Sequence, residues 1–182
     1  MKSILKSILF LTTLFTLNQA AAQIELPQDV VKWKFSVEQG KDCEATIVAE
    51  VAIPPHWHIN AIVLPKGVLG SPSKFELDKS PNYKLIGTVK EPKPIQTHDP
   101  LSDEDVVIHE GKVVFKQKIQ VLSKKDFVLN GMYGFQPCDE THCLFPYEAK
   151  FTVKVKGCED GTAQVEETDE TTAQTPVVAG ND

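Results

Sequence analysis

The sequence lacks most of the features that mark nucleic-acid-binding proteins and hydrolytic enzymes. Basic residues do not predominate, because 19 lysines and arginines stand against 25 aspartates and glutamates, for a formal net charge of −6. A chain with this charge is not suited to nucleic acid or to anionic membrane surfaces. The sequence also shows no serine triad, no phosphate-binding loop and no pair of carboxylates spaced for acid–base catalysis. Cysteines and histidines remain as the residues able to carry chemistry.

A hydrophobic run long enough to span a membrane is also absent. About 20 apolar residues are needed to cross the hydrocarbon layer, whereas the apolar run near the start covers only residues 8–17. Lysines precede this run and small alanines follow it. This order is typical of a secretory signal peptide. We therefore expect residues 1–22 to be removed by cleavage near Ala22–Gln23 and the mature protein to be periplasmic or secreted.

The mature chain contains no convincing helical pattern of ten or more residues. Instead, apolar and polar residues alternate with a period of two in several segments. The apolar members are Trp33, Phe35 and Val37; Ala45, Ile47, Ala49, Val51 and Ile53; Val113, Phe115, Ile119 and Val121; and Phe151, Val153 and Val155. Such alternation gives each strand one buried and one solvated face, as in antiparallel sheets. The pattern predicts an all-β protein built as an antiparallel two-sheet β-sandwich.

Turn residues and composition set the limits of the predicted strands. Asn130-Gly131 is a strong turn signal, and we expect a turn there. The segment KEPKPIQTHDPLSDED, residues 90–105, is interrupted by prolines and is predicted to be a long irregular loop, a kind of loop that is often functional. From residue 157 onward the chain is rich in Thr, Glu, Asp and Ala, which predicts a disordered acidic tail or linker over residues 157–182. Residues 23–156 then form a single domain.

Four cysteines are too few to mark a small disulfide-dense scaffold. Disulfides persist in an oxidising compartment, and four cysteines allow three pairings. Cys43 opens the second predicted strand and Cys158 follows the last one. A disulfide between them would tie strand ends together and, because its loop is long, could stabilise the fold by about 4 kcal/mol. The alternative is that one or both are free thiols.

The other two cysteines lie close together in QPCDETHCLFPYE, residues 136–148. If Cys138 and Cys143 oppose each other on a hairpin, their Cβ atoms lie within about 5.5 Å, near disulfide reach. A bridge that closes so short a loop stabilises little, but at a loop tip it is open to attack by a thiolate. His142, if protonated, would favour a thiolate at Cys143. A structural bridge, a redox pair and a zinc clip all remain open on chemistry alone.

Several segments make the chain similar to a known family from about Val31 to Val155. They are VKWKFSVEQ, PPHWHIN, NYKLIGTVKEPKPI, EGKVVFKQKI and CDETHCLFPYEAKF. These segments resemble the N-terminal periplasmic domain of the protein-disulfide reductase DsbD, in its Bacteroidetes-like form. The resemblance implies an immunoglobulin-like sandwich that acts as a thiol–disulfide oxidoreductase without metal or organic cofactor. It also implies two kinds of protein partner, a membrane electron-donor domain of the DsbD type and thioredoxin-fold acceptors in the periplasm.

The resemblance assigns the redox pair to Cys138 and Cys143. Cys143 would be the attacking thiol that forms mixed disulfides with partners, and Cys138 the resolving thiol. The residues expected to flank the pair are His58, Asn60, Leu101, His142 and Phe145. Residues 97–105 match the family's cap loop, with Leu101 at the position of its shielding aromatic residue. Where the family usually has Leu-Pro-Pro after the second cysteine, this chain has Leu-Phe-Pro, so Phe145 could supply apolar cover.

Two other functions remain as alternatives. The first is a non-catalytic immunoglobulin-like binding module in which the short bridge is structural. The second is a periplasmic metal-binding protein that uses His56 and His58, an HxH pair on one strand face. We expect a monomer with no metal site and no affinity for nucleic acid. The complete reductase continues into membrane helices and a thioredoxin-like domain, so the chain is either a stand-alone version or part of a longer protein.

Overall fold

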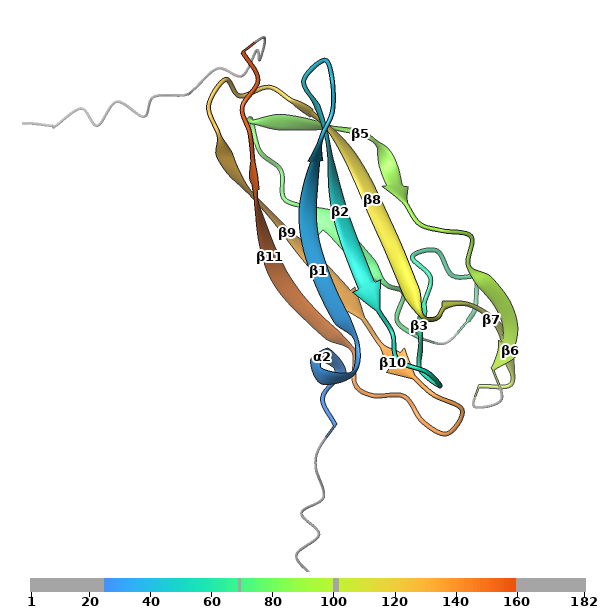
Figure 1. Cartoon of the computed structure of the whole chain (residues 1–182). Helices are drawn as coiled ribbons and strands as arrows, with labels where there is room; N and C mark the ends of the chain where they lie inside the picture. The colour runs from blue at the N-terminus through green and yellow to red at the C-terminus, as the bar shows by residue number, and fades with distance from the viewer. Residues whose placement is uncertain (1–24, 69, 100–101, 160–182) are drawn as a thin grey trace, which may run out of the picture.

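The computed structural model describes residues 25–68, 70–99 and 102–159 (Figure 1). The predicted signal peptide, Leu101 and the predicted tail from residue 160 lie outside these ranges. Within them the regular secondary structure is β-strand apart from one short helix, α2 (Pro27–Val30), ahead of the first strand. No helix in this part of the chain is long and apolar enough to cross a membrane.

Two antiparallel sheets pack face to face as a sandwich (Figure 1). The strands of the first sheet, in spatial order, are β1 (Lys32–Gln39), β2 (Glu44–Ala52), β8 (Lys112–Val121) and β5 (Tyr83–Lys90). Those of the second are β11 (Tyr147–Val155), β9 (Phe127–Phe135) and β4 (Lys74–Leu77). Alternate side chains such as Ile47, Phe115 and Phe151 fill the core between the sheets. The predicted immunoglobulin-like antiparallel sandwich is confirmed.

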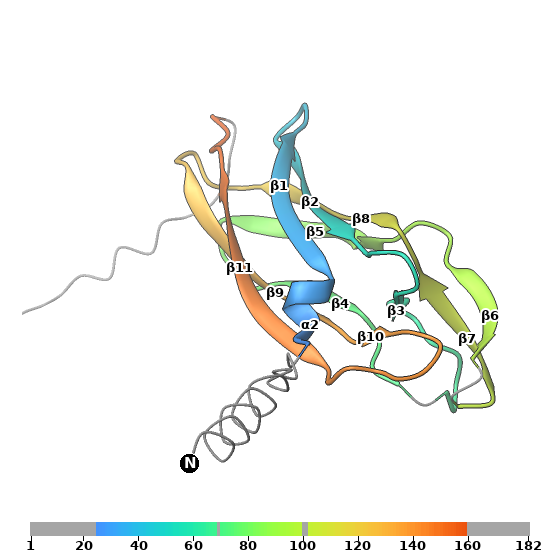
Figure 2. The same cartoon turned by 60° about the horizontal axis from the view of Figure 1, so that its bottom comes forward.

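A third sheet, made of short strands, extends from one end of the sandwich (Figure 2). Its strands, in spatial order, are β10 (Pro137–Cys138), β3 (His58–Asn60), β7 (Glu104–His109) and β6 (Ile95–Asp99). These short strands come from three distant parts of the chain. The third sheet therefore brings the predicted redox cysteines beside residues that the sequence separates from them by dozens of positions.

A disulfide joins the opposite end of the sandwich, where the β1–β2 loop and the end of β11 meet (Figure 1). Cys43 and Cys158 are bonded there, with Cα atoms 5.5 Å apart and a sequence separation of 115. The backbone around Cys158 is also held, because its N–H donates to the Ser123 carbonyl at 2.8 Å. Gly157 N–H donates to Asp126 Oδ1 at 2.8 Å. The fold therefore includes at least two residues past Lys156, where the domain was predicted to end.

The predicted turn at Asn130-Gly131 is wrong, because both residues lie inside β9. Gly131 stands opposite Phe151 of β11 and Leu77 of β4. A Cβ atom on Gly131 would lie 2.6 Å from the Phe151 ring and 2.5 Å from the Glu76 carbonyl oxygen. Glycine is thus present at this position for close packing in the middle of a sheet.

The prediction of a long irregular loop over residues 90–105 is also wrong in part. Residues Ile95–Asp99 form β6, which pairs with β7 in an antiparallel hairpin. Four of the five β6 side chains are exposed, so this edge strand lacks the alternation that identified the others. The hairpin forms the far edge of the third sheet, which also carries the cysteine pair.

Candidate functional site

Cys138 and Cys143 face each other across a short hairpin at the edge of the third sheet. They form an isolated antiparallel bridge, and a disulfide joins them with Cα atoms 4.0 Å apart. Within the hairpin, Asp139 N–H donates to the His142 carbonyl at 2.9 Å. Backbone hydrogen bonding therefore contributes to holding the two cysteines side by side, in addition to the bond between their sulfurs.

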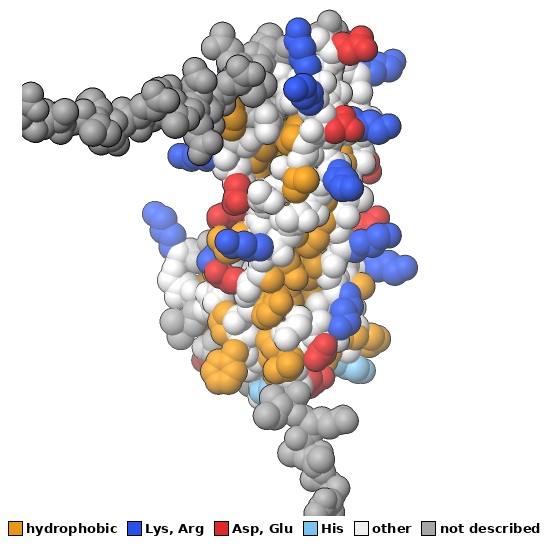
Figure 3. All heavy atoms as spheres, turned by 90° about the vertical axis from the view of Figure 1, so that its left-hand side faces the viewer, with side chains coloured by type: hydrophobic (Ala, Val, Ile, Leu, Met, Phe, Trp, Pro, Cys, Tyr) orange, Lys and Arg blue, Asp and Glu red, His pale blue; other side chains and the backbone are white. Residues whose placement is uncertain are grey.

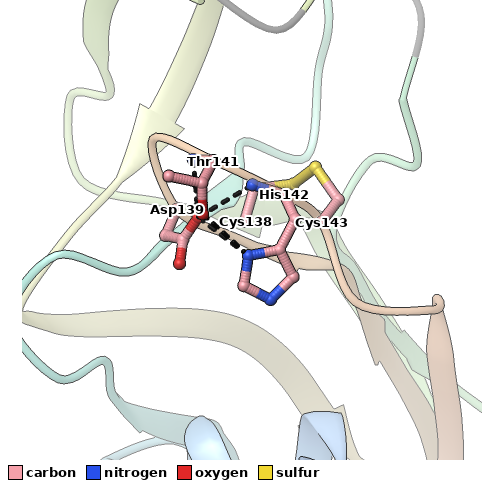
Figure 4. A network of polar contacts seen from close by, with 5 residues as sticks. All are labelled: Cys138, Asp139, Thr141, His142 and Cys143. Carbon is pink, nitrogen blue, oxygen red and sulfur yellow. Dashed lines mark hydrogen bonds and ion pairs between the residues drawn. A yellow bond between two sulfur atoms is a disulfide. The ribbon is translucent and has the colours of Figure 1, made fainter.

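The Asp139 carboxylate organises the tip of this hairpin (Figure 4). Its Oδ1 accepts hydrogen bonds from the Thr141 hydroxyl and the Thr141 N–H, both at 2.7 Å, and from the His142 N–H at 2.8 Å. His142 Nδ1 lies 3.1 Å from the same oxygen. The Thr141 hydroxyl, followed by the Thr141 amide, holds the pKa of Asp139 well below its ordinary value. Because Asp139 remains ionised, the tip is fixed as an Asx-type turn.

The two cysteines differ sharply in exposure. Cys138 lies on β10, which pairs with β3, and is 7% exposed. Cys143 lies on the outer arm of the hairpin and is exposed. A sulfur atom of another protein can therefore reach Cys143 far more easily than Cys138.

His58 lies directly opposite Cys138 in the β3–β10 register. The Cβ atoms of such antiparallel partners are about 4.5–5.5 Å apart, so the imidazole neighbours the buried cysteine. Burial lowers the pKa of His58, and the carboxylates of Asp99, Glu110 and Asp139 oppose this shift. The ring is therefore mainly neutral at neutral pH.

Asn60 supports the surroundings of the pair. It is 7% exposed, and its Nδ2 donates to the Ser71 carbonyl at 3.1 Å. Gln136, which the sequence did not single out, reaches the same segment, because Ser71 N–H donates to its Oε1 at 3.3 Å. Gln136 Nε2 donates to the Leu144 carbonyl at 3.0 Å, next to Cys143. A single glutamine between two strands gives no sequence signal that its side chain links Ser71 to Leu144.

Two of the remaining predicted flanking residues, His142 and Phe145, are exposed on the hairpin and the segment that follows it. His142 is exposed and sets its ring edge-on against Trp57, with ring centroids 5.5 Å apart. Phe145 is 88% exposed, so it does not provide the apolar cover expected of it. Leu101 lies outside the described residues, and its shielding role stays a prediction.

A cleft of about 290 Å³ separates the hairpin tip from the β6–β7 hairpin. Its lining residues are His58, Thr97, His98, Asp99, Val106, Ile108, Glu110, Asp139 and Glu140. Four of these nine residues are carboxylates, so the side of the pair that faces β6 and β7 is acidic.

The histidines do not form the expected HxH face. His56 has a φ of 70° and lies in the turn before β3, whereas His58 begins the strand. Among the described residues, no group of three or more His, Cys, Asp or Glu side chains is arranged to hold a metal ion. The structure thus gives no observation that favours the metal-binding alternative.

Comparison with known proteins agrees with the resemblance drawn from the sequence. A family model described as the N-terminal part of the thiol:disulfide interchange protein DsbD matches residues 22–173. The N-terminal domain of Neisseria meningitidis DsbD, solved in the reduced form, is similar at a TM-score of 0.51 and 11% identity, covering 74% of this chain and 92% of that one. The N-terminal periplasmic domain of Proteus mirabilis ScsB is similar at a TM-score of 0.51 and 16% identity, covering 73% of this chain and 49% of that one. No curated protein matches the sequence.

Proposed function

The chain belongs to the family of DsbD N-terminal domains, and from that premise we propose that it carries electrons by dithiol–disulfide exchange at Cys138 and Cys143. Its domain is a thiol:disulfide interchange domain, and the relatives of known structure include an N-terminal periplasmic domain. In the proposed function, a membrane donor domain of the DsbD type reduces the pair. The reduced pair then reduces thioredoxin-fold proteins in the periplasm or outside the cell.

The difference in exposure between the two cysteines is the observation that carries this proposal. In the first step, the Cys143 thiolate attacks the acceptor's disulfide, forms a mixed disulfide and releases one acceptor sulfur as a thiolate. In the second step, the Cys138 thiolate attacks Cys143 Sγ and releases the other acceptor sulfur. Two electrons pass to the acceptor, and Cys138–Cys143 closes as a disulfide. A donor dithiol restores the reduced pair by the reverse sequence.

The structure supports separate roles for the two sulfurs in these steps. The exposed Cys143 can meet a partner's sulfur, while the buried Cys138 can meet only Cys143, whose Cα lies 4.0 Å from its own. Neutral His58, opposite Cys138, is the nearest group on β3 able to accept the proton of the resolving thiol. Asp139 and Thr141 keep the hairpin closed while the sulfurs exchange.

A trapping experiment tests the assignment. The probe is a thioredoxin whose second cysteine is replaced by alanine and whose first carries a thionitrobenzoate group. We expect reduced Cys138→Ser to release thionitrobenzoate and accumulate a stable mixed disulfide with the thioredoxin. Cys143→Ser should form it at least about 100-fold more slowly, because the remaining thiol is buried. If Cys143→Ser is trapped and Cys138→Ser is not, the roles are reversed.

The reduction potential of the pair separates this function from a binding module with a structural bridge. Alkylation and mass spectrometry in graded glutathione buffers measure it. A value above about −250 mV, with exchange within minutes, is expected for an electron carrier. A value below about −300 mV with slow exchange would favour the structural bridge.

A further inference from the structure

We propose that Phe145 is the docking residue through which an acceptor protein engages this chain, its ring entering an apolar recess beside the acceptor's own disulfide. The inference rests on the proposed exchange at Cys143 and names a physical feature that the acceptor must have. No other exposed large hydrophobic side chain in the described part of the chain is as exposed as Phe145, at 88%.

The ring projects from a segment that is well held. Leu144 N–H donates to the Pro137 carbonyl at 2.9 Å, and the Leu144 carbonyl accepts from Gln136 Nε2 at 3.0 Å. Leu144 itself packs against the hydrophobic core. Pro146 follows and fixes its own φ. Phe145 therefore follows a hydrogen-bonded and packed residue and precedes one whose φ is fixed, which reduces the entropy lost when a partner orders it.

The chemistry of exchange requires that an acceptor lie within reach of this ring. A disulfide brings the Cα atoms of its two cysteines to about 5.5 Å of each other. Phe145 is two residues from Cys143, so their Cα atoms are separated by at most about 7 Å. A protein that forms a mixed disulfide with Cys143 thus brings its own backbone about as close to Cys143 as Phe145 is. The Phe145 ring is then within reach of that protein's surface. An acceptor without an apolar recess there would leave the phenyl ring against polar surface.

The surroundings of Cys143 indicate what the rest of the acceptor surface should be. Toward β6 and β7 the hairpin presents the carboxylates of Asp139 and Glu140, with Glu110 across the cleft. Hydrophobic side chains lie at this end of the molecule next to histidine (Figure 3). An acceptor that fits has an exposed disulfide with an apolar recess on one side and a neutral or basic rim on the other. A thioredoxin-fold protein of that surface chemistry is the occupant we infer.

The test compares a protein disulfide with a small one. The reduced domain is mixed with the thioredoxin that carries a thionitrobenzoate group on its first cysteine and, separately, with the small aromatic disulfide dithiobis(nitrobenzoate). The second-order rate constants of thionitrobenzoate release from the two disulfides are measured by stopped flow. For Phe145→Ala, we expect the ratio of the thioredoxin rate to the small-disulfide rate to fall at least about tenfold, as for an interface hot spot. Phe145→Leu should recover much of the ratio. Val128→Ala, on β9 far from the hairpin, is the matched control at an exposed apolar position and should leave the ratio unchanged.

Each other outcome overturns a distinct idea. If the wild-type domain reacts with neither disulfide, the proposed function itself fails. If it reacts with both and Phe145→Ala leaves the ratio unchanged, the function stands and the docking role of Phe145 is wrong. If sedimentation shows that wild type self-associates and Phe145→Ala does not, with equal rate ratios, the ring serves a second copy of the chain instead.

Discussion

At the residue scale, two side chains that take no part in the disulfide organise the site: the carboxylate of Asp139 and the imidazole of His58. Asp139 gathers the hydroxyl of Thr141 and the amides of Thr141 and His142 on one oxygen, and so holds the tip of the hairpin. This negative charge is close to the cysteines and disfavours a thiolate. The hairpin therefore gains rigidity at some cost in thiolate stability, which exposure of Cys143 to water partly offsets.

His58 gives the folded domain a specific pH dependence. Burial lowers its pKa below the ordinary value of 6.5, so the unfolded chain binds a proton more readily than the folded one. The free energy of unfolding should therefore fall as the pH drops through about 6.5 toward the lower folded-state value. His58→Gln should show a smaller loss between pH 7 and pH 5 in urea denaturation.

His56→Gln is the matched control for this prediction. His56 is exposed and lies in the turn two residues earlier, outside β3. We expect its pH profile to follow that of wild type. Parallel loss of stability in wild type and His58→Gln would show that another group sets the acid dependence.

At the element scale, the packing of β9 between β4 and β11 depends on Gly131, which stands opposite a residue of each of these strands. The Cβ of an alanine at position 131 would lie 2.5 Å from the Glu76 carbonyl oxygen on one side and 2.6 Å from the Phe151 ring on the other. Because one of these neighbours is backbone, the sheet must shift. We expect Gly131→Ala to lower the free energy of unfolding by about 1–3 kcal/mol, as overpacking does, in chemical denaturation followed by tryptophan fluorescence.

The neighbouring residue provides the control for Gly131→Ala. Asn130 lies on the same strand and is exposed, so Asn130→Ala should change the free energy of unfolding by less than about 0.5 kcal/mol. Equal stability of Gly131→Ala and wild type would mean that the second sheet can open around this position without cost.

The third sheet shows how weak elements can define a site. β3 and β10 are three and two residues long, and β6 is mostly exposed. None of these strands would be stable in an isolated hairpin. They are held because they join the strands and loops of the sandwich, and this attachment brings His58 opposite Cys138.

At the scale of the whole molecule, the two disulfides lie at opposite ends of the sandwich and have different consequences (Figure 1). Cys43–Cys158 closes a loop of 115 positions, whereas Cys138–Cys143 closes one of 5. Constraint of the unfolded chain grows with loop length, so the long bridge should contribute most of the disulfide stabilisation. We expect the double variant Cys43→Ala, Cys158→Ala to lose about 2–4 kcal/mol of unfolding free energy in urea.

The same double variant should retain the chemistry of the other end. Thionitrobenzoate release by its reduced Cys138–Cys143 pair should match wild type within about twofold, because distant sites act independently. A large fall in that rate, under conditions where the variant is folded, would show that the two ends are coupled.

The residues of the sequence determined the class of fold and located the cysteine pair. Alternation of apolar and polar residues fixed β1, β2, β8 and β11, since each has one face in the core and one in water. The quoted segments also identified the family. The same rules failed at Gly131, where a turn signal lies within a strand, and at β6, where an exposed edge strand has no alternation.

Only the tertiary structure decided how the two cysteines differ in exposure. Pairing of β10 with β3 buries Cys138, whereas Cys143 on the outer arm of the hairpin stays exposed. It also decided that Phe145 faces solvent and that Gln136 braces the segment before it. The physical reason is that exposure depends on which distant strands pair, and pairing is a property of the whole sheet, whereas alternation is written into each strand separately.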